Sequence, residues 1–277
     1  MFYILIFIIG LSIGSFLNVL IDRLPKDKSI TGRSHCDHCR KKLAWYDLIP
    51  ILSYLYLGAK CKYCGKRISF FYPLIEAVTG MMFVVVVMLL SLNIRGSLFA
   101  LGGFFNLENF DLVKRVLISI HTLALLGIVS MAIVIFFSDL EYQIIPDSIQ
   151  LALFVFSFFF LLTGGITAKV FFNQVGAAFV VMIPILFLFL GTKGKSMGFG
   201  DVKLAFNLGF LLGLLGGALA LYIGFVSGAI IGVILILFKK KGLKSKIAFG
   251  PFLVLGLVIM LFFGNSIVQI VRTKYPF

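Results

Sequence analysis

The chain has 277 residues, of which 61% are hydrophobic, only 13% are charged and 32 are phenylalanine. A soluble domain carries about 25% charged residues, and a water-soluble globule of this size could not bury so much apolar surface. The same composition excludes a disordered chain. The formal net charge is +14, but the basic residues lie in the gaps between apolar runs. Membrane orientation therefore accounts for them, and we expect no nucleic acid partner.

Apolar runs long enough to cross the hydrocarbon core, about 20 helical residues each, predict an all-α polytopic membrane protein with about eight transmembrane helices. In chain order they cover residues 2–22, 70–93, 113–138, 147–163, 168–191, 202–214, 215–238 and 247–271. The border near Gly213 to Gly217 decides between eight spans and seven, and seven would place the C-terminus on the other side of the membrane. Basic residues follow the first run and do not precede it, so we expect a retained helix and not a signal peptide.

Lys and Arg concentrate in the loops after the first, fifth and seventh spans. By the positive-inside rule these loops face the cytoplasm and both termini face outward. The loop of residues 139–147 departs from the rule, because it holds three acids and no Lys or Arg. The pattern divides the chain into a first helix (1–22), a cytoplasmic cysteine domain (23–69), a second helix with an outer loop (70–112) and a membrane core (113–277).

The cysteines form two C-x-x-C pairs in the large cytoplasmic loop: Cys36, Cys39, Cys61 and Cys64. Two such turns arrange four thiolates as a tetrahedron around Zn²⁺, and the neighbouring Lys and Arg side chains favour the thiolate form. Four sulfur ligands leave no open position on the metal, so we expect a small zinc-knuckle domain in which the ion is structural. The alternative, a disulfide or unrelated thiols, conflicts with a reducing compartment.

Two acids lie at the cytoplasmic ends of apolar helices: Asp139 ends the third span, and Asp201 opens the sixth after Gly198-Phe199-Gly200. A carboxylate at this depth is costly unless it faces a partner or a watery cavity. Two carboxyl groups that share one proton can act as general base and general acid on a peptide bond. The residues alone leave a simpler interpretation open, in which Asp139 and Asp147 terminate helices and Asp201 caps the helix that begins at Val202.

Several further motifs occur in order along the chain: Gly14 to Pro25, Trp45 to Tyr54 inside the cysteine loop, Tyr72 to Gly80, Asp139 to Asp147, Gly198 to Lys203 and Phe249 to Phe252. Together they resemble the bacterial type IV prepilin peptidases, a family of bifunctional leader peptidases and N-methyltransferases with intramembrane aspartic chemistry of the GxGD type. The resemblance extends over nearly the whole chain. It implies a peptidase core in residues 113–277 and a methyltransferase-associated domain in residues 23–69.

The resemblance implies that Asp139 and Asp201 are the catalytic aspartates. The motif residues around them, with a role in the motif or in substrate binding, are Gly198, Gly200, Glu141, Pro146, Asp147 and Lys203. The implied substrates are type IV prepilins or pseudopilins, whose short basic leader is removed at a Gly–Phe junction on the cytoplasmic side of the inner membrane. The acidic loop of residues 139–147 would then receive the positive charge of the leader.

The resemblance also implies methylation of the new N-terminal amine from S-adenosyl-L-methionine. No glycine-rich dinucleotide fingerprint marks a site for this cofactor. Asn18, Asp47 and Glu76, polar residues near the inner interface, are our candidates to line it, and helix capping or interface hydrogen bonds are their alternative roles. Members of the family usually carry glycine two residues before the third cysteine, at a position linked with the methyltransferase, where this chain has Ala59.

Two other classes of function fit part of the sequence. A proton-coupled transporter would use Asp139, Asp147 and Asp201 as a relay, but acids at one interface instead of the midplane argue against it. A non-catalytic assembly factor held together by zinc would need neither Asp139 nor Asp201. We expect a multi-pass protein surrounded by lipid, and the family resemblance implies the bacterial cytoplasmic membrane, with the zinc loop and the active site on the cytoplasmic side.

Overall fold

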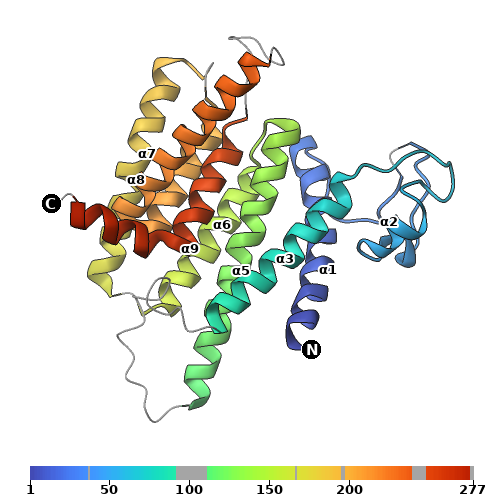
Figure 1. Ribbon diagram of the computed structural model, residues 1–277, viewed down its shortest axis with the longest axis horizontal. Helices are drawn as coiled ribbons and strands as arrows, with labels where there is room; N and C mark the ends of the chain where they lie inside the picture. Colours follow the sequence, from blue (N-terminus) through green and yellow to red (C-terminus); the bar gives the residue numbers. More distant parts are fainter. Residues whose placement is uncertain (37, 92–110, 166, 195–196, 239–247, 275–277) are drawn as a thin grey trace. The chain divides into compact units, whose positions relative to one another are not determined.

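The computed structural model describes residues 1–36, 38–91, 111–165, 167–194, 197–238 and 248–274 (Figure 1). Among these residues the secondary structure is helical apart from two isolated β-bridges, which confirms the predicted all-α fold. Six described helices are long and apolar enough to cross a bilayer, and a further apolar helix is shorter. The chain is a multi-pass membrane protein with two compact units, Met1–Ser91 and Leu92–Phe277. The ends of two predicted spans, residues 92–93 and 247, lie outside the described residues.

The first unit is built on two antiparallel helices, α1 (Phe2–Arg23) and α3 (Phe71–Ser91). A Cβ atom at Gly10 would lie 2.6 Å from the Cα of Gly80, so the two backbones touch where both residues lack a side chain. Close contact between small residues is the usual way in which helices associate in a membrane. The helices therefore bring Arg23 and Phe71, the two ends of the cysteine loop, to the same end of the pair.

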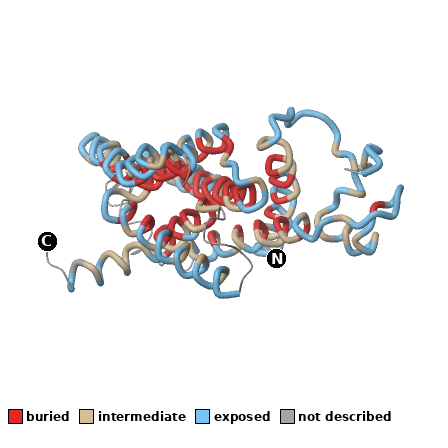
Figure 2. The backbone as a smooth tube through the Cα atoms, turned by 90° about the horizontal axis from the view of Figure 1, so that it is seen from above, coloured by how far each residue is buried: buried red, intermediate tan, exposed pale blue. Residues whose placement is uncertain are grey.

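The described residues of the cysteine loop form only short elements: η1 (Leu24–Lys26), η2 (Trp45–Leu48) and α2 (Leu52–Tyr56). Figure 2 shows it as almost entirely exposed or intermediate. Among its described residues only Cys61 is buried. Because the loop has no apolar core, another kind of interaction must hold it in shape.

The described residues of the second unit form five helices around one core: α5 (Asp111–Tyr142), α6 (Asp147–Thr163), α7 (Ala168–Gly191), α8 (Phe199–Leu237) and α9 (Gly250–Lys274). α5 packs against α6 and α9, while α8 packs against α6, α7 and α9. The fully buried side chains include Ile128, Ile135, Leu204 and Leu253. α9 therefore lies between the helix that carries Asp139 and the helix that carries Asp201.

Helix α8 is broken and reverses direction at Gly213. Its 39 residues would span ~58 Å as one straight helix, about twice the hydrocarbon thickness. Gly213 has φ +73° and ψ −177°, a backbone conformation that is available essentially only to glycine. A Cβ atom at Gly217 would lie 3.0 Å from the Cα of Gly209, whereas residues eight apart in a straight helix are ~12 Å apart. The two arms of α8 account for the predicted sixth and seventh spans.

Several helix ends differ from the predicted spans by a few residues, and two of these differences concern the acids. α5 continues to Tyr142, so Asp139 lies in its last turn and does not terminate it. α8 begins at Phe199 and not at Val202, so Asp201 is its third residue and not its N-cap. The helix begins earlier because the Asp201 carboxylate reaches back to the backbone N–H of Gly198. The sequence pattern misplaced these ends because it shows where apolar residues stop, whereas hydrogen bonds decide where the helix stops.

Candidate active site

Asp139 is nearly buried, with 6% of its surface exposed. Its Oδ2 accepts a hydrogen bond of 2.8 Å from the backbone nitrogen of Gly250, which lies 111 residues further along the chain. Gly250 is the first residue of α9, and the carbonyl of Phe249 accepts the first hydrogen bonds of that helix. Asp139 therefore caps the N-terminus of α9, where the aligned peptide dipoles favour a negative charge.

Asp201 lies in the first turn of α8, with 7% of its surface exposed. Its Oδ2 accepts a hydrogen bond of 3.1 Å from the Gly198 nitrogen. Its Oδ1 is buried and has no hydrogen-bond partner among the described residues. Burial of a carboxyl oxygen without a partner is costly, so a native structure retains such an atom only for a reason.

The two carboxyl groups come from distant segments but lie close enough to interact electrostatically. A Cβ atom at Gly200, just before Asp201, would lie 3.1 Å from the Cβ of Ile145, which follows Asp139 in the connection between α5 and α6. Ser138, which is fully buried beside Asp139, has a hydroxyl without a partner among the described residues. The site therefore combines two buried acids, one of which keeps an oxygen without a partner among the described residues that can bind a water molecule or a peptide.

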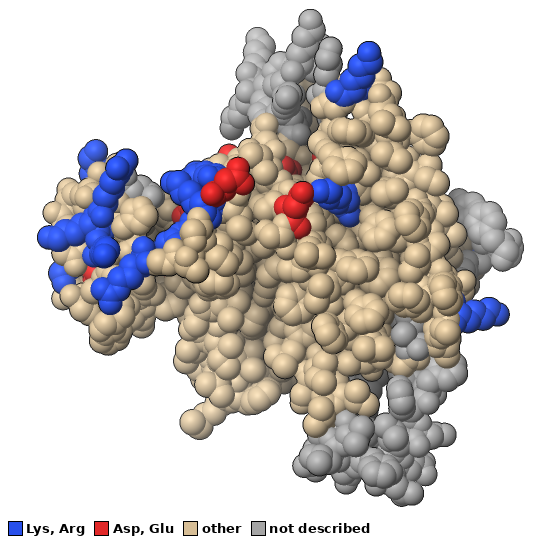
Figure 3. Space-filling view, turned by 180° about the vertical axis from the view of Figure 1, so that it is seen from behind, with Lys and Arg blue, Asp and Glu red and all other residues tan. Residues whose placement is uncertain are grey.

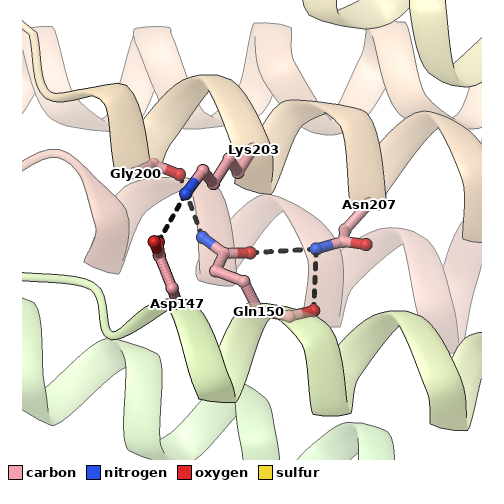
Figure 4. A network of polar contacts seen from close by, with 5 residues as sticks. All are labelled: Asp147, Gln150, Gly200, Lys203 and Asn207. Carbon is pink, nitrogen blue, oxygen red and sulfur yellow. Dashed lines mark hydrogen bonds and ion pairs between the residues drawn. The ribbon is translucent and has the colours of Figure 1, made fainter. Parts of the chain in front are cut away.

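A line of polar contacts joins the start of α6 to the start of α8 (Figure 4). Lys203 Nζ lies 2.6 Å from Asp147 Oδ1. One turn further along α6, the Nε2 of Gln150 donates to the Gly200 carbonyl at 2.9 Å, and its Oε1 accepts from Asn207 Nδ2 at 2.9 Å. Both amides are buried, with 4% of Gln150 and 5% of Asn207 exposed. Gln150 thus fastens the turn that carries Asp201 to a neighbouring helix.

The remaining motif residues of the second unit lie around these acids in different roles. Pro146 is buried and is the N-cap of α6. Glu141 is exposed, whereas the charge of Asp147 is engaged by Lys203. Asp139 is buried and Asp147 is paired with Lys203. Glu141 is therefore the exposed acid of residues 139–147 that lies outside this ion pair.

Sequence reasoning missed the roles of Gly250, Gln150 and Asn207. The Gly-Pro pair at residues 250–251 is a helix-start signal, but it does not reveal which carboxylate lies opposite. A stronger signal was present for the amides. Gln150 follows Asp147 by three residues and Asn207 follows Lys203 by four, so each polar side chain continues the helix face of its charged neighbour.

The residues predicted to line a cofactor site lie in the first unit. Glu76 Oε2 accepts a hydrogen bond of 2.8 Å from the Ile51 nitrogen, which attaches the cysteine loop to α3. Asp47 Oδ2 accepts from the Ala44 nitrogen at 3.1 Å and so caps its own turn. Asn18 Nδ2 donates to the Tyr72 carbonyl at 3.1 Å, while its buried Oδ1 has no partner among the described residues. The carboxylates of Asp47 and Glu76 therefore each accept a backbone hydrogen bond, as a cap and as a link between segments. Asn18 retains one buried atom, Oδ1, without a partner among the described residues.

The four cysteine sulfurs lie within 4.8 Å of one another, and the Sγ atoms of Cys36 and Cys64 are 3.9 Å apart. Sulfurs placed ~2.3 Å from a tetrahedral zinc ion are ~3.8 Å apart, so the cluster has the dimensions of a Zn(Cys)₄ site. The two C-x-x-C turns share a backbone pattern in which Cys36 and Cys61 donate to Lys41 and Lys66, and Arg40 and Gly65 donate back to the two cysteines. The residues present therefore fit a structural metal.

Ala59 adopts φ +58°, in the left-handed region that favours glycine. Its nitrogen donates to the Tyr54 carbonyl at 2.9 Å and its carbonyl accepts from Ile68 at 2.8 Å. These bonds hold the loop on the approach to Cys61. Alanine at this position, where the family usually has glycine, therefore keeps the backbone conformation of a glycine. Holding its side chain in the left-handed region costs about 1–2 kcal/mol.

Metal binding to the cysteine cluster should depend on pH. The backbone N–H of Tyr63 lowers the pKa of Cys61 to about 7. The backbone N–H of Lys66 lowers the pKa of Cys64, but desolvation and the neighbouring thiols raise it to about 11. Because zinc binds thiolates, protons compete with it as the pH falls, and we expect the affinity to drop about tenfold per pH unit for each proton released.

A competition titration with a chromophoric chelator on the full chain, repeated at several pH values, measures this dependence. The variant Cys36→Ser, which retains three thiols, should bind more weakly and release fewer protons. An affinity that does not change between mildly acidic and mildly alkaline pH would contradict ligation by thiolates.

Comparison with known proteins finds matches for both the cysteine-containing first unit and the helical second unit. Residues 8–90 match the bacterial peptidase A24 N-terminal domain, and residues 126–233 match the type IV leader peptidase family. A relative from Bacillus subtilis (strain 168), named prepilin leader peptidase/N-methyltransferase, is 30% identical over 273 residues, which cover 96% of this chain and 96% of the relative. A protein of the same name from Aeromonas hydrophila is 29% identical over 308 residues, with 99% and 95% covered. No solved structure matches the chain.

Proposed function

Because the chain belongs to the prepilin leader peptidase/N-methyltransferase family, we propose that it removes the basic leader of type IV prepilins or pseudopilins and then methylates the new N-terminus. Family membership makes it an enzyme. The observation that carries the peptidase half is the pair of buried aspartates Asp139 and Asp201, whose carboxyl groups are close enough to interact. Each has one oxygen fixed by a backbone N–H at a helix start.

In the proposed cleavage the two aspartates hold one proton between them. Asp139, whose negative charge the N-terminus of α9 favours, takes a proton from a water molecule. The water oxygen forms a bond to the scissile carbonyl carbon while Asp201 donates its proton from Oδ1 to the carbonyl oxygen. The C–N bond then breaks as the proton held by Asp139 passes to the leaving amine. One hydroxyl of the tetrahedral diol returns its proton to Asp201, which leaves a carboxylic acid and restores the single shared proton. The unpartnered Oδ1 of Asp201 supports this assignment.

We further propose that cleavage takes place on the cytoplasmic side of the inner membrane, as the Lys and Arg distribution predicts. The prepilin leader carries positive charge, and the exposed carboxylate of Glu141 would attract it. Asp147 supports the site in another way, because its ion pair with Lys203 joins the starts of α6 and α8.

For the methyl transfer we propose that the cysteine loop and the adjacent ends of α1 and α3 hold S-adenosyl-L-methionine. Asn18, with its unpaired Oδ1, supports a role in contacting the cofactor. Asp47 and Glu76 would shape the pocket through the backbone bonds that they accept. Cys36, Cys39, Cys61 and Cys64 would hold a zinc ion that would cross-link the loop, and four sulfur ligands would leave no open position for catalysis.

Incubation of the purified full chain with a prepilin and S-adenosyl-L-methionine, followed by mass spectrometry, tests the proposal. We expect loss of the leader together with a methyl increment on the mature product. A proton-coupled transporter or a non-catalytic assembly factor would leave both masses unchanged.

The buried amides should matter for cleavage, because Gln150 fixes the Gly200 carbonyl beside Asp201 and Asn207 orients Gln150. We expect Gln150→Leu and Asn207→Leu each to lower the kcat of cleavage about tenfold, the equivalent of one or two buried hydrogen bonds. KM and the methylation of a pre-cleaved substrate should change little. The double variant should lose scarcely more than the worse single one, because the two residues act through one contact.

Ser157→Ala provides the matched control for this pair. Ser157 is buried on the same helix α6, and among the described residues its hydroxyl donates to the Leu153 carbonyl of that helix, at 2.7 Å. The Ser157→Ala variant should therefore cleave the leader with a kcat close to that of the unmodified protein. Equal losses of cleavage and methylation in the Gln150 variant would indicate general destabilisation and contradict the positioning role.

A further inference from the structure

The cysteine loop exposes an apolar segment whose partner is not yet assigned. Residues 45–56, which cover η2 and α2 and are called the ridge below, contain a single charged side chain, Asp47. Their exposed fractions reach 78% for Trp45, 67% for Leu55 and 91% for Tyr56. Contiguous apolar surface of this kind marks contact with another protein or with a membrane.

A hydrogen bond sets the depth of the ridge relative to the membrane-spanning helices. The Ile51 nitrogen, in the middle of the ridge, donates to Glu76 Oε2 at 2.8 Å. Glu76 lies in the second turn of α3, five residues after Phe71, which is ~7.5 Å along the helix. The ridge therefore lies beside the ends of α1 and α3, at the level where apolar spans meet the polar interface, and not far out in the cytoplasm.

The surroundings of the ridge are strongly basic. Figure 3 shows Lys and Arg side chains gathered over the cysteine loop. The exposed ones are Lys26, Lys28, Arg33, Arg40, Lys41, Lys42, Lys60, Lys62, Lys66 and Arg67. Some are interleaved with aromatic rings, since Lys62 Nζ lies 4.8 Å from the centre of the Tyr46 ring. A surface that combines apolar side chains with this excess of positive charge is complementary to an anionic lipid layer.

We infer that the ridge inserts into the headgroup layer of the membrane and that the basic residues around it bind anionic lipid. Trp and Tyr prefer this layer because their rings are apolar and their N–H or O–H groups remain hydrated. Lys and Arg lie at the same level and meet the lipid phosphates. Lipid contact at this position fixes the cysteine loop against the bilayer, independently of any chemistry at Asp139 and Asp201.

Trp45 is the only tryptophan of the chain, so its fluorescence reports on the ridge alone. The full chain is reconstituted into vesicles of phosphatidylcholine alone or mixed with phosphatidylglycerol, each with and without brominated acyl chains. In the anionic vesicles we expect blue-shifted emission and at least twofold quenching by the brominated lipids. Quenching should be weaker in pure phosphatidylcholine and should decrease with added salt, because salt screens the attraction.

Two charge reversals separate lipid binding from a general charge effect. The double variant Lys60→Glu, Lys62→Glu, next to the ridge, should lose the dependence on phosphatidylglycerol. Lys169→Glu, an exposed lysine at the start of α7, should retain it. The catalytic variant Asp139→Asn should also retain it, so failure of the proposed function and failure of this inference are distinguishable.

The opposite results overturn the inference in recognisable ways. Strong quenching of Trp45 by aqueous iodide, without quenching by brominated lipid, would place the ridge in water. Protection from both quenchers would show that protein covers it.

Discussion

Replacement of either Asp139 or Asp201 by asparagine should lower leader cleavage by roughly a thousandfold or more. Asparagine keeps the size of the side chain and its acceptor oxygen, so the bonds to Gly250 and Gly198 can persist. It cannot hold or release the proton that the proposed mechanism moves. The buried site also loses an unpaired carboxylate, so we expect stability to be unchanged or slightly increased.

The measurement is the rate of leader loss by mass spectrometry, with thermal unfolding in detergent as the check on folding. The double variant should be no worse than either single one, because the two groups act as one unit. Asp27→Asn, an exposed acid in the cysteine loop, is the matched control and should cleave normally. Substantial turnover by either single variant would refute the paired mechanism, whereas methylation of a pre-cleaved substrate should survive in both.

The sequence predicted the parts of the fold that depend on composition and local pattern. Apolar runs located the helices because each must satisfy its backbone within the bilayer. The spacing of Cys36, Cys39, Cys61 and Cys64 predicted a cluster because a C-x-x-C turn fixes two thiols by local geometry alone. Gly213 appeared only as an uncertain border, because its positive φ results from the reversal that packs Gly209 against Gly217.

The contacts of the acids could not be predicted, because they are tertiary. Asp139 has the sequence position of a helix terminator, yet its carboxylate caps a helix that begins 111 residues later. Similarly, Glu76 has the features of a ligand-binding acid buried in an apolar helix, but it accepts a backbone bond from the cysteine loop. In both cases a polar residue near a helix end indicates that an unpaired backbone group is close by. It does not reveal to which segment that group belongs.

Gly250 connects this packing to catalysis, and Gly250→Ala should lower cleavage about a hundredfold, a loss comparable to that of one well-placed donor. A Cβ atom there would lie 2.8 Å from Asp139 Oδ2 and 3.1 Å from its Cβ and Cγ. A carboxylate of such short reach cannot move aside and still accept the Gly250 N–H, so either Asp139 turns away or the start of α9 shifts. In both cases Asp139 loses the helix N-terminus that favours its charge.

Two other glycines of α9 serve as controls that separate this effect from helix packing. A Cβ atom at Gly264 would meet only Met260 Cε, at 3.5 Å, so Gly264→Ala should retain full activity. A Cβ atom at Gly256 would collide with the backbone carbonyl of Ala220, so Gly256→Ala should lower the thermal stability. If Gly250→Ala lost stability as Gly256→Ala does, its lost activity would reflect packing. Lost cleavage with a normal unfolding temperature would instead indicate that the start of α9 holds Asp139 in its reactive form.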